Sequence, residues 1–257
     1  MIGQRELLEK LNSYTLSSLP HSILLEGERG CGKHTLFSLL ADKFGVDTEV
    51  ISGKLDYEYI STLFTRVSPF FCCVDGVPTD REQNALLKFL EEPPAMCYVF
   101  ILCENRNEYL ETVQNRCVQF KFSQYTKDEL RQFTTNDIVL EYANTPGQVI
   151  EFSNIDMGEM ISLCDTILQK IDTASIPNTL TLSSKFNFGK DPTKFSVELF
   201  CRLLLRKALA YAVGNPDRNY DEAYFIVSEL CSKLNIPSID KKKLFESKLL
   251  DLKFALK

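Results

Sequence analysis

The residues best suited to chemistry lie in one glycine-rich segment near the start of the sequence. Residues 27–35 read Gly-Glu-Arg-Gly-Cys-Gly-Lys-His-Thr and match the phosphate-binding pattern G-x-x-x-x-G-K. In such a loop the backbone N–H groups surround an anion, and the following helix adds partial positive charge. The candidate binding residues are Gly27, Gly30, Gly32, Lys33, His34 and Thr35. The pattern predicts a loop for the phosphates of ATP or ADP, with Lys33 reaching the outer ones.

One position of this loop departs from the pattern. The residue after the lysine is ordinarily Ser or Thr, whose hydroxyl binds Mg²⁺, whereas this sequence has His34. An imidazole is a poor ligand for this hard cation, and Thr35 comes one residue too late to replace the hydroxyl. We therefore do not expect a regular Mg²⁺ site. The alternative interpretation is a loop that only caps the next helix and binds nothing.

A second candidate group is the carboxylate of Asp75, which follows the apolar run 70–74. Nucleotide hydrolases of this type place a metal-binding Asp at the end of a strand, and a Glu that orients the attacking water usually follows it. Here the next residue is Gly76, which has no side chain to orient water. The missing hydroxyl and the missing glutamate together argue against ATP hydrolysis. The alternative is that Asp75 only ends a strand.

A further candidate is Arg116, in the segment Asn-Arg-Cys at residues 115–117, just before the last expected strand. Taken alone, an arginine at such a position is most often an exposed solvated residue.

These residues stand between the elements of an alternating pattern. Five short candidate strands are separated by segments with helical spacing. Apolar runs lie at residues 22–25, 49–51, 70–74 and 98–103, and apolar and polar residues alternate at 118–122. Continuous apolar strands separated by helices indicate a parallel sheet that is covered on both faces. The sequence therefore predicts an α/β fold over residues 1–122.

Two helices of this part have distinct signals. Residues 55–67 carry apolar side chains on one helical stripe. Residues 79–92 begin with the capping-box pair Thr79 and Glu82, and two prolines follow the last helical residue. Both helices fit the alternating pattern.

The pattern changes after residue 122. Residues 125–171 suggest short helices, and residues 173–193 are rich in Ser, Thr, Asn and Pro, which favours a linker or long loop. Three amphipathic helices are expected at residues 195–213, 221–234 and 240–257. We therefore expect three parts, at residues 1–122, 123–172 and 173–257.

The overall charge limits the classes of protein. The chain has 29 Lys and Arg against 35 Asp and Glu, a net charge of −6. This balance excludes a protein that coats DNA or an anionic membrane through bulk electrostatics. The longest apolar run, residues 98–103, is far shorter than the ~20 residues that span a membrane. The first residues also lack the apolar core of a signal peptide, so we expect a cytoplasmic protein with no membrane partner.

The nine cysteines fit the same interpretation. Most stand inside apolar runs and none forms a Cys-x-x-Cys pair, so we expect reduced, buried thiols that act as small hydrophobic residues. A zinc site is the weaker alternative, because paired metal spacing is missing. We therefore expect no metal site.

Several segments resemble clamp-loader subunits of the AAA+ ATPase superfamily, and most of all the delta-prime subunit family of bacterial DNA polymerase III. The most specific segment, residues 84–94, reads Asn-Ala-Leu-Leu-Lys-Phe-Leu-Glu-Glu-Pro-Pro and is nearly the signature helix of the family. Residues 2–4, 21–27, 100–105 and 112–117 are similar to other family segments. The last of these resembles the Ser-Arg-Cys motif, with Asn115 in place of the serine. The motifs cover the first ~122 residues, and beyond them only the architecture is similar.

The resemblance implies a P-loop AAA+ core, a helical lid and a helical collar for the three expected parts. Five such subunits form an open ring, a component of the DNA polymerase III holoenzyme, that places a sliding clamp on primer–template DNA. ATP lies between neighbouring subunits. Arg116 would be an arginine finger that acts in trans on the ATP of a neighbour. Asn105 takes the sensor 1 position, and Asp75 the Walker B position.

The departures from the family pattern are as informative as the matches. His34 and Gly76 replace two groups needed for hydrolysis, and Gly147 stands where motor subunits carry the sensor 2 arginine. The zinc module of many relatives is absent, because residues 41–69 contain no Cys. We therefore expect a delta-prime-like stator with no intrinsic ATPase activity. The alternatives are an active gamma/tau-type motor subunit and an AAA+-like protein of another assembly.

Overall fold

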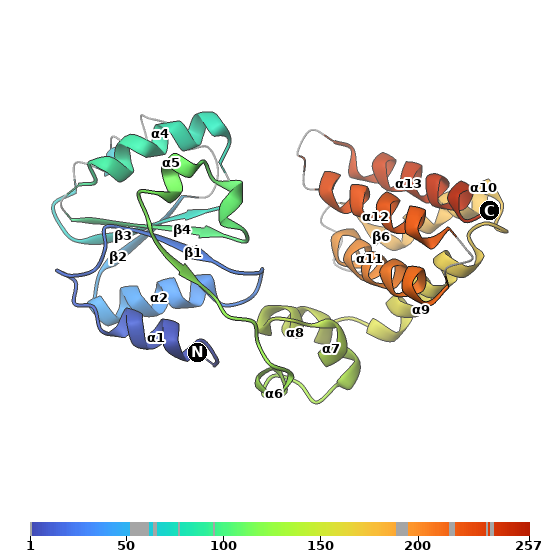
Figure 1. Cartoon of the computed structure of the whole chain (residues 1–257), viewed down its shortest axis with the longest axis horizontal. Helices are drawn as coiled ribbons and strands as arrows, with labels where there is room; N and C mark the ends of the chain where they lie inside the picture. Colours follow the sequence, from blue (N-terminus) through green and yellow to red (C-terminus); the bar gives the residue numbers. More distant parts are fainter. Residues whose placement is uncertain are drawn as a thin grey trace. The chain divides into compact units, whose positions relative to one another are not determined.

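The computed structural model describes residues 2–51, 62–63, 66–76, 78–94, 96–188, 195–215, 219–234, 236 and 239–257. The chain divides into two compact units, Met1–Glu151 and Phe152–Lys257. The first contains a β-sheet with helices, and the second is mostly helical (Figure 1). The helix expected at residues 55–67 falls mostly outside the described residues. The three-part division at residues 122 and 172 remains a prediction.

The first unit is built on a five-stranded parallel sheet. Its strands are β1 (Ser22–Glu26), β2 (Asp47–Ile51), β3 (Phe70–Asp75), β4 (Cys97–Cys103) and β5 (Val118–Lys121). Their spatial order is β2-β3-β4-β1-β5, and every neighbouring pair is parallel. All seven residues of β4 are buried, as are the first five of β3. Continuous burial of this kind requires cover on both faces of the sheet.

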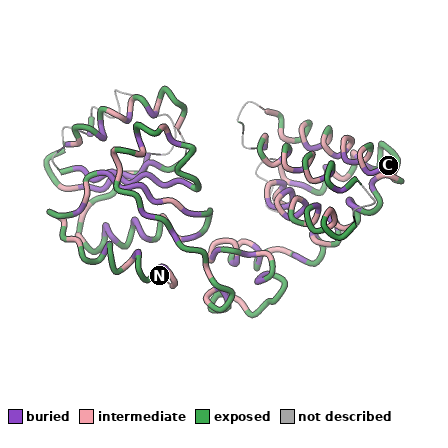
Figure 2. Tube along the Cα trace, in the orientation of Figure 1, coloured by how far each residue is buried: buried purple, intermediate pink, exposed green. Residues whose placement is uncertain are grey.

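Helices provide this cover. On one face lie α1 (Arg5–Asn12) and α2 (Lys33–Phe44), and on the other α4 (Asp80–Glu91) and α5 (Glu111–Gln114) (Figure 1). Phe37 of α2 contacts Phe100 edge-to-face on the first side. Phe89 of α4 is fully buried on the second side. The three inner strands β1, β3 and β4 are accordingly buried along most of their length, whereas the outer strands β2 and β5 are more exposed (Figure 2). The predicted α/β fold with a parallel sheet is confirmed.

The start of α4 follows the capping signal that its sequence carries. Thr79 is the N-cap, and a capping box joins it to Glu82. The backbone N–H of Thr79 donates to Glu82 Oε2 at 2.9 Å. Such a box satisfies backbone donors that the first helical turn leaves unpaired, which stabilises a helix by about 1 kcal/mol. The predicted capping box is therefore confirmed, and it fixes where α4 leaves the sheet edge.

The remaining part of the first unit consists of short helices. After the 3₁₀ turn η1 (Arg106–Glu108) and β5 come α6 (Lys127–Leu130), α7 (Asp137–Tyr142) and α8 (Pro146–Ser153). Gln4 links the start of the chain to the connecting segment after β5, because its amide donates to Ser123 O and accepts from Ser123 N, each at 2.7 Å. Lys127 Nζ donates to Ala143 O at 2.8 Å and links α6 to the end of α7.

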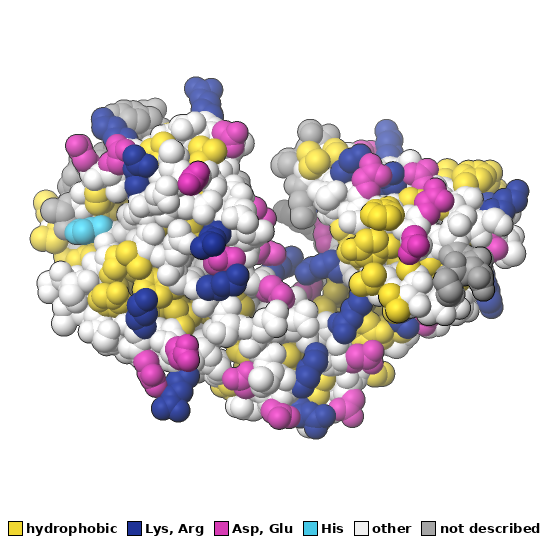
Figure 3. All heavy atoms as spheres, in the orientation of Figure 1, with side chains coloured by type: hydrophobic (Ala, Val, Ile, Leu, Met, Phe, Trp, Pro, Cys, Tyr) yellow, Lys and Arg dark blue, Asp and Glu magenta, His cyan; other side chains and the backbone are white. Residues whose placement is uncertain are grey.

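The second unit is helical. Its main helices are α9 (Met157–Lys170), α11 (Val197–Gly214), α12 (Tyr220–Lys233) and α13 (Lys241–Ala255). Phe186, Phe200 and Phe245 are each buried, and the rings of the first two lie 4.4 Å apart. Hydrophobic side chains also remain on its surface (Figure 3). Among the described residues, no helix is both long and apolar enough to cross a membrane.

The linker expected at residues 173–193 is corrected by the structure over its described part. Residues 176–181 form α10 (Ile176–Thr181), followed by η2 (Leu182–Lys185) and β6 (Phe186–Asn187), which pairs with β7 (Phe195–Ser196). Ser175 caps α10, and Pro177 stands in its first turn. Ser before Pro is as typical of a helix start as of a loop, so composition alone suggested the wrong element.

Candidate functional site

The glycine-rich loop lies between β1 and α2, as its sequence predicts. Gly30 and Gly32 have φ angles of 81° and 103°, and Gly32 is the N-cap of α2. Residues with a Cβ adopt this left-handed region only at a cost, so glycines are required at these two positions. Gly27 N donates to Cys103 O at 3.1 Å and fixes the start of the loop to β4. The loop therefore starts at the carboxyl end of the central strands.

Lys33 turns back over its own loop. Its ammonium group donates to Gly27 O and, at 3.1 Å, to Glu28 O. An ammonium group has three donors, so one remains for an external acceptor. The lysine is thus held at the mouth of the loop in a position compatible with a phosphate ligand.

His34 and Asp75 face each other where a magnesium ion would be expected. His34 Nε2 lies 3.3 Å from Asp75 Oδ2, and both side chains are about half exposed. Mg²⁺ requires oxygen ligands in a near-octahedral arrangement, and the pair offers one carboxylate and an imidazole that contacts it directly. No cluster of three or more His, Cys, Asp or Glu side chains suited to a metal occurs within the part of the chain that the structure describes. These residues do not fit a regular magnesium site.

The carbonyl oxygens of the loop are engaged by the segment that begins α8. Thr145 Oγ1 donates to Arg29 O at 2.9 Å, and Gly147 N donates to Gly30 O at 2.9 Å. A Cβ on Gly147 would lie 2.5 Å from Gly30 Cα, which is closer than real side chains come. The sequence singled out Gly147 only for the arginine that it lacks. The structure adds that this position is in backbone contact with the loop.

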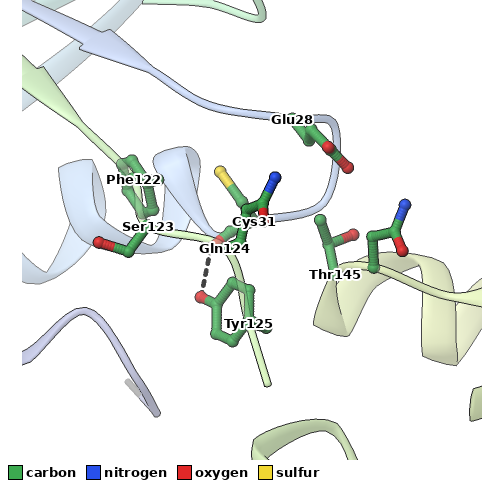
Figure 4. Close-up of a pocket in the computed structure, with 8 residues that line it drawn as sticks. Glu28, Cys31, Phe122, Ser123, Gln124, Tyr125 and Thr145 are labelled. Atoms are coloured by element: carbon green, nitrogen blue, oxygen red, sulfur yellow. Dashed lines mark hydrogen bonds between the residues drawn. The ribbon is translucent and has the colours of Figure 1, made fainter. Parts of the chain in front are cut away.

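A cavity of about 160 Å³ borders the loop on the side of residues 122–125, the connecting segment after β5 (Figure 4). It is lined by Glu28, Cys31, Phe122, Ser123, Gln124, Tyr125, Asn144 and Thr145. Tyr125 donates its hydroxyl to Cys31 O at 2.7 Å, and burial raises the pKa of Tyr125 to about 12. The hydroxyl therefore stays protonated at neutral pH, and its hydrogen bond joins the connecting segment after β5 to the glycine-rich loop.

Asn105 and Asp75 share the sheet edge with the loop. Asp75 ends β3, and Asn105 follows the end of β4, the strand that pairs with both β3 and β1. The side chain of Asn105 accepts from Asn107 N at 3.0 Å and caps η1. The carboxyl ends of parallel strands lie on the same side of a sheet. This side therefore brings together four candidate residues, Lys33, His34, Asp75 and Asn105.

Arg116 lies at the opposite end of the strands, on the side where the strands begin. It precedes β5, whose first residue Val118 pairs with Ile23 near the start of β1. Its Nη1 donates to Thr112 O at 2.7 Å, and its Nη2 forms an ion pair with Glu91 at the end of α4. The glycine-rich loop comes only after the end of β1, about 16 Å further along for a five-residue strand. Arg116 and the loop of the same chain are therefore separated by the length of the strand.

The sequence reasoning missed Gln83. This side chain is 1% exposed, its amide N donates to Pro78 O at 3.0 Å and to Glu108 O at 3.3 Å, and its oxygen accepts from Leu110 N at 2.7 Å. It thereby joins the start of α4 to the segment between η1 and α5. The sequence did contain a sign of this buried polar residue. Gln83 stands three residues before Leu86 and seven before Leu90, which places a polar side chain on the apolar face of α4.

The cysteines are free thiols, as predicted. Seven of the nine are buried and two are half-buried. Burial raises the pKa of Cys117 to about 12 and that of Cys231 to about 11. These groups are protonated at neutral pH, which makes them poor nucleophiles and poor metal ligands.

The parallel sheet, the loop between β1 and α2 and the helical C-terminal part define the fold of P-loop NTPases. Two solved structures share this fold. A DNA polymerase III gamma-subunit-related protein of Thermotoga maritima matches with a TM-score of 0.60 at 15% identity, over 99% of this chain and 100% of that one. A point variant of RuvB from the same species matches with a TM-score of 0.54 at 15% identity, over 97% of this chain and 88% of that one.

Sequence comparisons narrow the class. Residues 77–126 match the family model "DNA polymerase III, delta subunit". A replication factor C small subunit of Methanococcus maripaludis is 24% identical over 72% of this chain and 66% of its own length. The DNA polymerase III subunit gamma of Buchnera aphidicola is 23% identical over 56% of this chain and 50% of its own length. The chain thus spans slightly less than two thirds of the first of these relatives and half of the second. At low identity, it is similar to the clamp-loader family of DNA replication.

Proposed function

We propose that the protein is a delta-prime-like clamp-loader subunit, a stator of the loader ring. It assembles with other loader subunits, supplies Arg116 to the ATP site of a neighbour and hydrolyses no ATP itself. Contact with the sliding clamp and with primer–template DNA is made through the assembled ring.

The observation that carries this proposal is the position of Arg116. The loop and Arg116 lie at opposite ends of the strands of one parallel sheet, separated by about 16 Å along β1. This exceeds the length of an arginine side chain, so Arg116 does not serve the loop of its own chain. An arginine that stabilises a transferring phosphoryl group must contact it directly. A phosphate that reacts beside Arg116 would therefore have to belong to another subunit.

The absence of hydrolysis rests on three positions in the loop region. His34 contacts Asp75 where the Mg²⁺ would lie, and Gly76 has no group to orient water. Gly147 touches the backbone of Gly30, which leaves no room for an arginine side chain there. Lys33 retains one donor, so ATP or ADP remains a candidate ligand without hydrolysis.

Ring assembly is supported by the surface of the second unit. Leu209 and Val213 of α11, Phe225 of α12 and Phe254 of α13 are 49%, 81%, 69% and 61% exposed. These four side chains lie on three helices of the unit, and exposed apolar surface is available for contact with other subunits. We therefore assign the helical unit to contact with the other loader subunits.

The test begins with the pure protein and with a loader reconstituted from the subunits of the same organism. The pure protein should show no Mg²⁺-dependent ATP turnover. Arg116→Ala should leave assembly unchanged and lower the clamp-dependent ATPase of the loader, since an arginine finger contributes roughly 10³-fold or more at its own site. Arg5→Ala is the matched control, because Arg5 is exposed and pairs with Glu9 on the surface of α1.

Three results would count against the proposal. Turnover by the pure protein that Lys33→Ala abolishes would identify an active motor subunit instead. Failure to join the reconstituted loader would point to another assembly. Unchanged turnover of the Arg116→Ala loader would refute the action in trans.

A further inference from the structure

The guanidinium group of Arg116 is held from two sides. Nη1 donates to Thr112 O at 2.7 Å, within the same short helical turn. Nη2 contacts a carboxylate oxygen of Glu91, the last residue of α4. An arginine side chain carries five N–H donors, so these two contacts leave three. The side chain is 32% exposed, and the remaining donors are thus available to a ligand outside the chain.

Both residues that contact the guanidinium are exposed, but each is next to residues of the hydrophobic core along the chain. Glu91 follows Phe89 and Leu90, which are 0% and 5% exposed. Thr112 precedes Val113, which is fully buried in the same cluster between α4, α5 and the sheet. The backbone of Glu91 and the carbonyl of Thr112 therefore have fixed positions relative to the sheet, and both contacts of the arginine start from this fixed backbone.

We propose that Glu91 is a positioning residue for Arg116, which holds the guanidinium ready for a phosphate of a neighbouring subunit. This inference rests on the proposed function. A free arginine side chain populates many rotamers, and ordering it at the moment of reaction slows the step that needs it. The contact with Glu91 orders the side chain before the neighbour binds, while the three unused donors stay open.

Neighbouring residues provide a matched control. Glu92 is adjacent to Glu91, has the same charge and is exposed, but its side chain forms no ion pair among the described residues. If only the local negative charge mattered, the two glutamates would be interchangeable. If the contact matters, only Glu91 affects the arginine.

The test compares Glu91→Ala, Glu91→Gln and Glu92→Ala in the reconstituted loader. One ring contains several ATP sites, so the readout is the part of clamp-dependent turnover that Arg116→Ala removes. Glu91→Ala should lower this part about tenfold in kcat with KM unchanged, because the arginine is displaced from its working position but the ATP site is intact. Glu91→Gln keeps an acceptor oxygen and should retain at least about half of it. Glu92→Ala should have no effect.

A double-mutant cycle separates positioning from a structural role. Glu91→Ala added to Arg116→Ala should cause no further loss of turnover. The thermal midpoint of the isolated chain should change by less than about 2 °C on Glu91→Ala, because a half-exposed ion pair contributes little to stability.

The outcomes distinguish the two proposals. If Arg116→Ala removes no turnover, the proposed function fails. If it does, but Glu91→Ala matches the unchanged protein or turns over faster, the positioning role is overturned and the arginine finger stands. A further loss in the Arg116→Ala background, or an equal effect of Glu92→Ala, would also overturn it.

Discussion

Replacing Gly147 by alanine tests the contact between the glycine-rich loop and the start of α8. The new Cβ would lie 2.5 Å from Gly30 Cα and 3.1 Å from Gly30 O. Gly30 cannot easily yield, because its φ of 81° already requires glycine and its oxygen accepts from Gly147 N. The segment that begins α8 must therefore move away from the loop.

The magnitude follows from three contributions. Overpacking at a site that cannot relax costs about 1–3 kcal/mol. The hydrogen bonds to Gly30 O and Arg29 O lengthen, and each is worth about 1 kcal/mol. Alanine in place of glycine inside a helix returns up to about 1 kcal/mol. We expect a net loss of about 2–4 kcal/mol in the free energy of unfolding of the first unit.

Urea unfolding followed by circular dichroism measures this loss, and amide hydrogen exchange at residues 29–31 and 145–148 locates it. Gly214→Ala is the control, because a Cβ there meets nothing within 4 Å at the end of α11. That variant should be as stable as the unchanged protein or slightly more so. Equal urea midpoints for the two variants, with no faster exchange around Gly30, would refute the contact.

Three further predictions concern the interior. Gln83→Leu should destabilise the first unit by about 2–4 kcal/mol in urea unfolding, because it leaves the partly buried Leu110 N–H and two carbonyls without their partner; an unchanged midpoint would contradict this. The folded protein should react slowly with a thiol reagent at pH 8, since burial raises the pKa of Cys117 and Cys231, and all nine cysteines should react in denaturant. Because unfolded thiols ionise near pH 9, stability should fall as the pH rises above about 9.

Local patterns predicted the elements that local physics determines. The strands were evident because a strand covered on both faces must be apolar throughout, as β3 and β4 are. The loop and the capping box were evident because each depends on residues within a few positions of one another, such as Thr79 and Glu82. For these features the sequence contains all the interacting groups in one segment.

Features that depend on distant residues were not predictable in this way. Gly30 and Gly147 meet across more than one hundred residues, and only the fold makes their backbones touch. The ion pair of Glu91 with Arg116 likewise joins the ends of two helices. Gln83 stands on an apolar stripe and is satisfied by backbone groups of other segments, so its role is visible only when those segments are in place.

The glycine-rich loop and Arg116 lie at opposite ends of the strands, so the two ends of the sheet carry different groups. Under the proposed function, a chain that offers an arginine at one end of its strands and a nucleotide loop at the other would associate head-to-tail, and such contacts continue until a member interrupts them. If the loop edge of this chain hydrolyses nothing, an arginine offered to that edge would have no reaction to assist. The chain would then be suited to the terminal place in a row of subunits, where only its arginine edge is needed.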